Sequence, residues 1–186
     1  MRAFIGLALP EEARRSLERL QQELADSGAD VKWVEPRNLH LTLKFLGEIS
    51  EAQRESVEAM LAGLAARTPP FLVRVKDVGA FPTRESPRVI WVGTSDGQEA
   101  LTRLAGAIEQ EGRRLLLPAE ERPFTAHLTL GRTRSSRGLA HLAERLRTMS
   151  WDPPAPWQVA GVSFYRSELS DAGPTYSVLA EYPLTT

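Results

Sequence analysis

One eight-residue pattern occurs twice in this chain and constrains its fold more than any other feature. Residues 36–43 read Pro-Arg-Asn-Leu-His-Leu-Thr-Leu, and residues 123–130 read Pro-Phe-Thr-Ala-His-Leu-Thr-Leu. Both copies therefore contain Pro-x-x-x-His-Leu-Thr-Leu, and they lie almost half of the 186-residue chain apart. The repeat predicts that the two halves of the chain build related units whose histidines occupy equivalent positions.

Each copy alternates apolar and polar side chains, which is typical of a β-strand that buries one face. In the first copy, Leu39, Leu41, Leu43 and Phe45 fall on the core side, whereas His40, Thr42 and Lys44 fall on the other side. In the second copy, His127 and Thr129 share one face in the same way. We therefore expect each strand to display a His-Thr pair on a strand that its leucines anchor in a core.

The remaining chain mixes strand and helix patterns without strict alternation. Helices are expected after Pro10, after the capping-box pair Ser50 and Gln53, and around residues 101–108 and 139–149. Strands are expected at residues 2–9, 31–34, 39–46, 71–78, 89–92, 126–130, 157–165 and 175–182. This order favours an α+β fold with mostly antiparallel pairing, built as one domain over residues 1–186.

Charge and composition exclude several classes of protein. The 23 Lys and Arg residues nearly balance the 24 Asp and Glu residues, so no sequence-wide positive field holds long nucleic acid, and any phosphate recognition must be local. Cysteine is absent, which excludes disulfides, thiolate nucleophiles and Cys-ligated metals. No apolar run is long enough to span a membrane, so we expect a cytoplasmic protein without membrane contact.

Two histidines and two threonines suit phosphodiester chemistry if the strands lie side by side. Displacement at phosphorus requires a base on the attacking oxygen and an acid on the leaving oxygen, on opposite sides of the phosphorus atom. Two imidazoles share these roles near neutral pH, and threonine hydroxyls donate to the non-bridging oxygens. The third histidine, His141, lies in a helical pattern and is expected at the surface or in helix packing.

A metal site is the competing interpretation of paired histidines. Zinc sites usually take three or four His, Cys, Asp or Glu ligands, and no carboxylate stands beside either histidine in the sequence. Lys44, placed by alternation on the His40 face, would oppose a metal and favour a phosphate. We therefore expect chemistry without a metal or other cofactor.

At these residues the chain resembles the 2H phosphoesterase superfamily, and more closely the bacterial and archaeal RNA 2',3'-cyclic phosphodiesterases, formerly called 2'-5' RNA ligases. Ala126 departs from the family, which commonly has proline there. The resemblance spans nearly the whole chain, through residues 2–5, 38–47, 79–82, 122–132 and 165–169.

The resemblance implies a bilobal fold with two pseudo-symmetric sheets around a central cleft, and hydrolysis of a 2',3'-cyclic phosphate at an RNA end to a 2'-phosphate. It implies that His40 donates a proton to the 3' oxygen and that His127 accepts one from water. The sequence alone leaves these two roles exchangeable. Thr42 and Thr129 would hold the phosphoryl oxygens, and the reverse reaction would join RNA ends through a 2'-5' linkage without ATP.

The resemblance also implies that Arg132 contacts phosphate. On an unbroken strand Arg132 would point to the leucine side, so Gly131 would have to permit a bend, and a solvated arginine is the alternative. For Phe45 the family suggests stacking on a base, but alternation favours core packing. Tyr165 and Arg166 receive no catalytic role. We expect a monomer that acts on RNA ends or nucleotides, with a non-catalytic RNA-end or nucleotide-binding module as the alternative.

Overall fold

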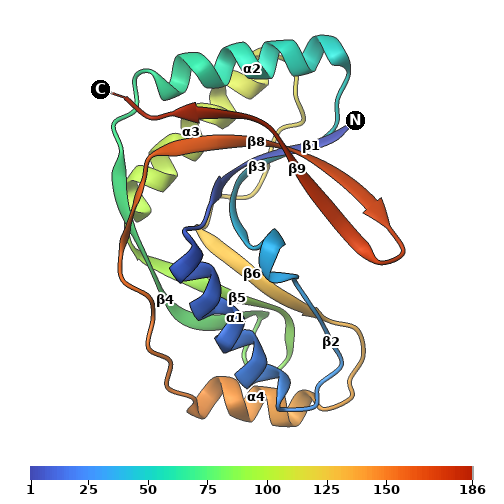
Figure 1. The fold of residues 1–186 in the computed structure, drawn as a ribbon. Coiled ribbons are helices and arrows are strands. Elements are labelled where there is room, and N and C mark those ends of the chain that lie inside the picture. Colours follow the sequence, from blue (N-terminus) through green and yellow to red (C-terminus); the bar gives the residue numbers. More distant parts are fainter. Residues whose placement is uncertain (186) are drawn as a thin grey trace.

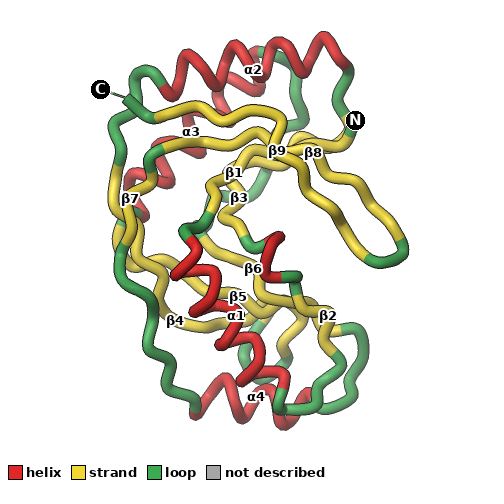
Figure 2. Tube along the Cα trace, in the orientation of Figure 1, coloured by secondary structure: helices red, strands yellow, loops and turns green. Residues whose placement is uncertain are grey.

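Two antiparallel sheets lie one above the other in the computed structural model, which describes residues 1–185 (Figure 1 and Figure 2). Every strand pairing within those residues is antiparallel, so the predicted α+β class is confirmed. Residue 186, the end of the predicted domain, lies outside the described residues. The upper sheet has the order β3 (His40–Glu48), β1 (Arg2–Ala8), β8 (Gly161–Ser170), β9 (Gly173–Pro183). The lower sheet has the order β2 (Val31–Trp33), β6 (His127–Thr133), β5 (Pro87–Asp96), β4 (Phe71–Pro82), β7 (Trp157–Val159).

The two halves of the chain repeat one series of elements. The first series is β1, α1 (Glu11–Ala25), β3, α2 (Glu51–Ala65) and β4, and the second is β5, α3 (Gln98–Arg114), β6, α4 (Leu139–Thr148) and β8. A one-turn helix, η1 (Pro36–Asn38), precedes β3. In each half, the strand that carries the His-Thr pair therefore follows one strand and one helix of the same half.

The first helix of each half covers the other lobe. The helix α1 follows β1 of the upper sheet but lies against the lower sheet, where it contacts α4 (Figure 1). The helix α3 follows β5 of the lower sheet but packs on β3 and α2 in the upper lobe. The lobes thus exchange helices, and each motif strand lies against a helix from the opposite half.

Local sequence accounts for the start of two of these helices. Proline precedes α1, and Glu11 and Glu12 occupy its first turn, where carboxylates favour the positive end of the helix dipole. The predicted capping box at α2 is present: Gln53 N donates to Ser50 Oγ at 3.2 Å, and Ser50 N donates to Gln53 Oε1 at 3.0 Å.

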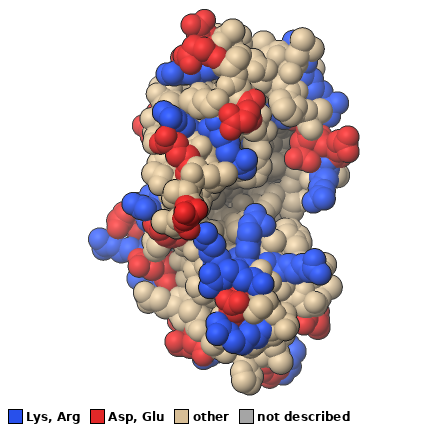
Figure 3. Space-filling model, turned by 90° about the vertical axis from the view of Figure 1, so that its right-hand side faces the viewer, with Lys and Arg blue, Asp and Glu red and all other residues tan. Residues whose placement is uncertain are grey.

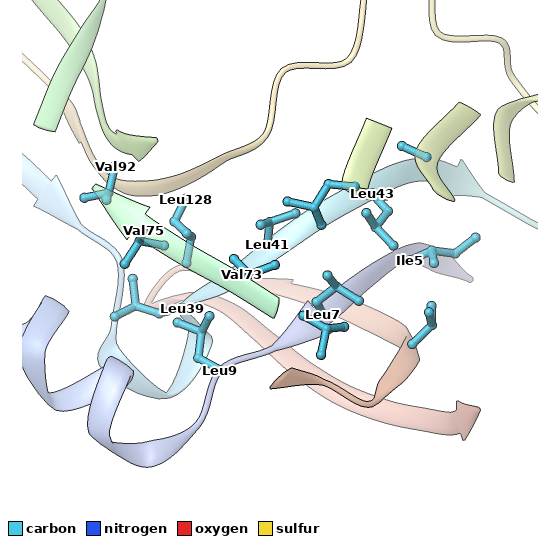
Figure 4. Close-up of a cluster of buried hydrophobic side chains, with 14 of the residues drawn as sticks. Ile5, Leu7, Leu9, Leu39, Leu41, Leu43, Val73, Val75, Val92 and Leu128 are labelled. Carbon is cyan, nitrogen blue, oxygen red and sulfur yellow. The ribbon is translucent and has the colours of Figure 1, made fainter. Parts of the chain in front are cut away.

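The leucines of both motif strands contribute to the core that joins the lobes. Leu41 and Leu128 are 1% and 0% exposed, and Figure 4 shows both in one cluster with valines of the lower sheet. Burial of a leucine side chain stabilises a fold by roughly 1.5–3 kcal/mol. These residues therefore anchor the strands from behind, as the alternating pattern predicts.

Four expected strands differ clearly in their bounds from the observed ones. Residues 157–165 form two strands, because the chain crosses from the lower sheet to the upper sheet at Ala160. The strands β4 and β5 extend beyond residues 71–78 and 89–92, since they pair along a long hairpin with irregular register. The strand β6 begins at His127 and continues past Leu130, because it pairs with β2 as well as β5.

Candidate active site

A β-bulge interrupts each motif strand at the same place. In β3, Leu43 is the extra residue, since Ile5 pairs with Lys44 and Gly6 pairs with Thr42. In β6, Leu130 is the extra residue, since Ile90 pairs with Gly131 and Trp91 pairs with Thr129. A bulge of this kind reverses the facing of the side chains that follow it, as far as the next register shift, which in β3 occurs at Leu46.

The first bulge corrects the expectations for Lys44 and Phe45. Lys44 does not share the His40 face but is 5% exposed on the core side. Phe45 is not a core residue: it is 60% exposed, and its ring centroid lies 6.1 Å from that of Phe4. The alternating pattern predicted the opposite facing because it assumed one residue per pleat throughout the strand.

Because of the second bulge, the Arg132 side chain does not point to the leucine side of β6, as it would on an unbroken strand. Gly131 is the second bulge residue, and a Cβ on it would lie 2.7 Å from Val31 Cγ1 and 2.9 Å from Trp33 Cε3. Only glycine fits this close approach of β2 to β6 without displacing a neighbour. Arg132 is exposed and occupies in β6 the position that Phe45 occupies in β3.

Backbone carbonyls orient both imidazoles in the same way. The Nδ1 atom of His40 lies 2.6 Å from the carbonyl oxygen of Asn38, and Nδ1 of His127 lies 2.7 Å from that of Thr125. A carbonyl only accepts, so each Nδ1 carries a proton and donates it. Each ring therefore leaves Nε2 as the atom that gains or loses a proton.

The surroundings of the two rings differ. His40 packs against aromatic rings, with centroid distances of 4.6 Å to Phe4, 5.2 Å to Tyr176 and 6.0 Å to Tyr165. Burial lowers the pKa of His40, although its hydrogen bond to the Asn38 carbonyl acts in the opposite direction. Its Nε2 lies 2.8 Å from Thr42 Oγ1, so the motif threonine contacts the reactive nitrogen.

His127 is half-buried and meets one aromatic ring, that of Phe81, edge-on at 5.6 Å. Phe81 pairs with Val89 in the lower sheet as Tyr165 pairs with Phe4 in the upper sheet, so Phe81 and Tyr165 are counterparts. Within residues 1–185 no hydrogen-bond partner is found for Nε2 of His127. This nitrogen is therefore more accessible to water than its counterpart in His40.

At each bulge, a polar side chain of the exchanged helix forms a hydrogen bond with a bulge residue. In the upper lobe, Lys44 Nζ donates to Glu109 Oε2 of α3 at 2.5 Å and to the Pro118 carbonyl at 2.7 Å. Burial raises the pKa of Glu109, but the hydrogen bonds from Lys44 and Arg113 outweigh it, and the resulting pKa is lowered. Glu109 is therefore ionised and balances the charge of Lys44.

In the lower lobe, Gln21 of α1 fastens the second bulge. Its Nε2 donates to the carbonyl oxygen of Leu130 at 2.9 Å and to that of Val34 at 2.8 Å, and the residue is 5% exposed. The Leu130 carbonyl also accepts a hydrogen bond from Val34 N at 2.8 Å, so Gln21 adds a second donor at the bulge and links β6 to the Val34 carbonyl. The exchanged helices thus stabilise the bulged conformation of both motif strands, and this conformation determines the direction in which the Phe45 and Arg132 side chains point.

The two motif strands contact each other between the sheets. Tyr176, on the β9 edge of the upper sheet, contacts His40, and burial raises the pKa of its phenol while the charges of Arg2 and Arg132 act in the opposite direction. Arg132 of β6 therefore lies near Tyr176, the residue that borders His40.

His40 also borders a cavity of about 170 Å³ that His127 does not line. The charged groups of this cavity are Arg14, Arg37 and Glu181.

Sequence reasoning missed several residues around the histidines. Asn38 fixes the loop before His40, because its side-chain amide donates to the Pro174 carbonyl at 2.9 Å. Phe4 and Tyr176 enclose His40. The sequence places Phe4 in the first expected strand and among the residues of the resemblance, but it indicates no role at the site for either aromatic residue. Tyr165 is buried and stacks on Phe4 at 4.7 Å, whereas Arg166 pairs with Glu168 at 2.8 Å. His141 is exposed on α4, as expected.

Two features are absent from the part of the chain that the structure describes. No group of three or more His, Asp or Glu side chains in residues 1–185 is arranged to hold a metal ion. None of the helices in the same residues has the length and apolar character that crossing a membrane requires.

Comparisons with known proteins agree with this architecture. The family model described as LigT like Phosphoesterase matches twice, at residues 7–91 and 92–176, in agreement with the internal repeat. The RNA 2',3'-cyclic phosphodiesterase of Aquifex aeolicus (strain VF5) is 34% identical over 187 aligned residues, covering 99% of this chain and 97% of the relative.

Solved structures share the fold over their full length. The protein TT0787 of Thermus thermophilus superposes with a TM-score of 0.83 at 32% identity, covering 99% of this chain and 98% of that one. The apo form of E. coli LigT gives a TM-score of 0.79 at 26% identity, with coverage of 100% and 98%. That protein has also been crystallised in complex with 3'-AMP. The predicted bilobal phosphoesterase fold is confirmed.

Proposed function

Because this chain belongs to the LigT-like phosphoesterase family, we propose that it hydrolyses RNA 2',3'-cyclic phosphate ends to 2'-phosphates, with two histidines and no metal. The observation that carries this proposal is the paired site: two His-Thr strands in contact, each with Nδ1 held by a backbone carbonyl and Nε2 left to react. The similarity to RNA 2',3'-cyclic phosphodiesterases over nearly the whole chain supports the substrate class.

The proposed reaction is an in-line displacement. His127 Nε2 accepts a proton from water as the water oxygen forms a bond to phosphorus, and the bond from phosphorus to the 3' oxygen breaks. His40 Nε2 gives its proton to that departing oxygen, so the product is a 2'-phosphate with a free 3' hydroxyl. Thr42, Thr129 and Arg132 hold the non-bridging oxygens, whose negative charge grows in the transition state.

The different surroundings of the two rings support this division of roles. The more open His127 suits contact with water, whereas the aromatic enclosure of His40 suits contact with the nucleoside that carries the leaving oxygen. Burial disfavours the charged form of His40, and a phosphate anion bound beside it favours that form again. A 5' hydroxyl in place of water would give a 2'-5' linkage by the same steps, without ATP.

We also propose that the protein acts as a cytoplasmic monomer.

Phosphorus NMR of the reaction tests the activity directly. Incubation with a nucleoside 2',3'-cyclic phosphate in excess chelator is expected to convert the cyclic signal to that of a 2'-phosphate. An unchanged cyclic signal with tight binding would instead identify a non-catalytic nucleotide-binding module. Activity that returns only with added metal would contradict the metal-independent mechanism.

The pH dependence of kcat/KM is expected to be bell-shaped, because one histidine must be protonated and the other neutral. Burial lowers the pKa of His40, so the lower apparent pKa of the profile should lie below the ordinary histidine value of about 6.5. Substitution Tyr176→Ser admits water to His40, which should raise its pKa and move the pH profile of kcat/KM to higher pH. A flat rate between about pH 5 and 9 would contradict the histidine pair.

A further inference from the structure

Three exposed cations near the cleft have no acidic partner. They are Arg2 on β1, Lys32 on β2 and Arg132 on β6. None of the ion pairs formed among residues 1–185 includes any of them, although most other arginines of the chain pair with carboxylates. Figure 3 shows a hollow between the lobes with Lys and Arg side chains gathered along its lower lip. Unpaired cations at a hollow are available to an anionic ligand.

These cations surround the same hairpin, β8–β9. Lys32 is the register partner of Arg132 across β2 and β6, so the two side chains are neighbours on one face. The Nζ atom of Lys32 lies 3.5 Å from the place where a Cβ on Gly173 would stand, which puts it at the hairpin turn. The lower lobe thus directs two positive charges toward the upper lobe at this point.

Arg2 approaches the hairpin from the upper lobe. Alternation along β1 puts Arg2 on the face of Phe4, whose ring centroid lies 4.9 Å from that of Tyr176 on β9. The charges of both Arg2 and Arg132 act on the Tyr176 phenol. Tyr176 also borders His40. The Tyr176 side chain therefore lies between the three cations and His40, the proposed proton donor.

The proposed displacement fixes what part of the substrate lies there. The 3' oxygen leaves toward His40, so the terminal ribose lies on the His40 side of the reacting phosphorus. Both the 2' and the 3' oxygens of that ribose belong to the cyclic phosphate, and the chain continues only through the 5' oxygen. The next phosphoryl group is therefore carried past His40 and Tyr176.

We propose that Arg2 and Lys32, with Arg132 between them and the reacting phosphate, form a subsite for the 5'-phosphoryl group of the terminal nucleotide. This inference rests on the proposed function. The group is either a free 5'-phosphate or the phosphodiester that joins the preceding nucleotide, because cations recognise the same anionic oxygens in both. The protein then distinguishes RNA ends from unphosphorylated cyclic nucleosides by one additional negative charge.

Three substrates separate the possibilities. They are adenosine 2',3'-cyclic phosphate, the same nucleotide with a 5'-phosphate, and the adenylyl dinucleotide with a 2',3'-cyclic phosphate and a free 5' hydroxyl. Both substrates with a 5'-phosphoryl group are expected to show kcat/KM about tenfold above that of the first, with the advantage decreasing as salt increases. Equal values for all three would overturn the inference, and so would an advantage confined to the dinucleotide.

Matched variants locate the effect. Arg2→Gln and Lys32→Gln should each reduce the advantage of the 5'-phosphoryl substrates by about threefold, because each removes one exposed phosphate contact. Arg145→Gln, on the exposed face of α4, changes the net charge equally and should leave the advantage intact. An equal reduction in the Arg145 variant would assign the effect to net charge and reject the subsite.

A binding experiment keeps this inference distinct from the proposed activity. If none of the three substrates is hydrolysed, the proposed function fails, but calorimetry with 3'-AMP and adenosine 3',5'-bisphosphate still tests the subsite. The two ligands differ only in the 5'-phosphate, and the bisphosphate should bind about tenfold more tightly. Equal affinities would reject the subsite whatever the protein catalyses.

Discussion

Replacing His40 or His127 by alanine is expected to lower kcat by about 10²-fold to 10⁴-fold, because each substitution removes one of the two proton transfers of the displacement. Steady-state hydrolysis of a nucleoside 2',3'-cyclic phosphate measures the loss. The double variant should be little slower than either single variant, since groups that act in one step are not additive.

The third histidine supplies the control for this experiment. His141 is exposed on α4, outside both motifs, so His141→Ala should retain the kcat of the unmodified protein. Undiminished turnover in His40→Ala or His127→Ala would refute the two-histidine mechanism. A similar loss in all three variants would point to damage to the fold rather than to the reaction.

Replacing Glu109 by methionine is expected to lower the free energy of unfolding by about 2–4 kcal/mol, because the Lys44 ammonium would keep its charge without a carboxylate. The side chain of Lys44 is 3% exposed and that of Glu109 is 21% exposed, so water compensates little of this loss. Urea unfolding followed by circular dichroism measures the change. Glu99→Met on the same helix is the control, since the Glu99 side chain is 86% exposed and its pairing with Arg103 contributes little.

The double variant Lys44→Met with Glu109→Met tests the cause of the loss. Removing both charges leaves no unpaired ion in the core, so the pair should be more stable than Glu109→Met alone. If the double variant is no more stable than that single variant, the buried charge of Lys44 is not what destabilises it.

The His-Thr pairs could be predicted from the sequence because their facing depends only on local alternation. His40 and Thr42, like His127 and Thr129, precede the bulge on their strands, where one residue per pleat holds. Phe45 could not be placed in this way, since a bulge depends on how the partner strand pairs and not on the side chains of the bulged strand. Lys44 continues the alternation of the residues before it, so its side chain gives no sign of the bulge.

The exchange of helices lay beyond sequence reasoning for a similar reason. The apolar stripe of α1, with Leu17 and Leu20, shows that the helix is buried on one face but not which sheet it covers. The boundary at Ala160 was also hidden, because the apolar residues on both sides of it read as one strand although they belong to two sheets. Long-range pairing decides both features.

The exchanged helices make the two halves of the chain structurally dependent on each other. Either half alone would expose the sheet face that the other half's helix covers, and its motif strand would lose the side chain that fastens its bulge. Two copies of one half-length polypeptide, each lending its first helix to the other, would complete the same architecture as an intertwined homodimer. The matching bulges and the two family-model matches in tandem show how closely the two halves repeat one unit.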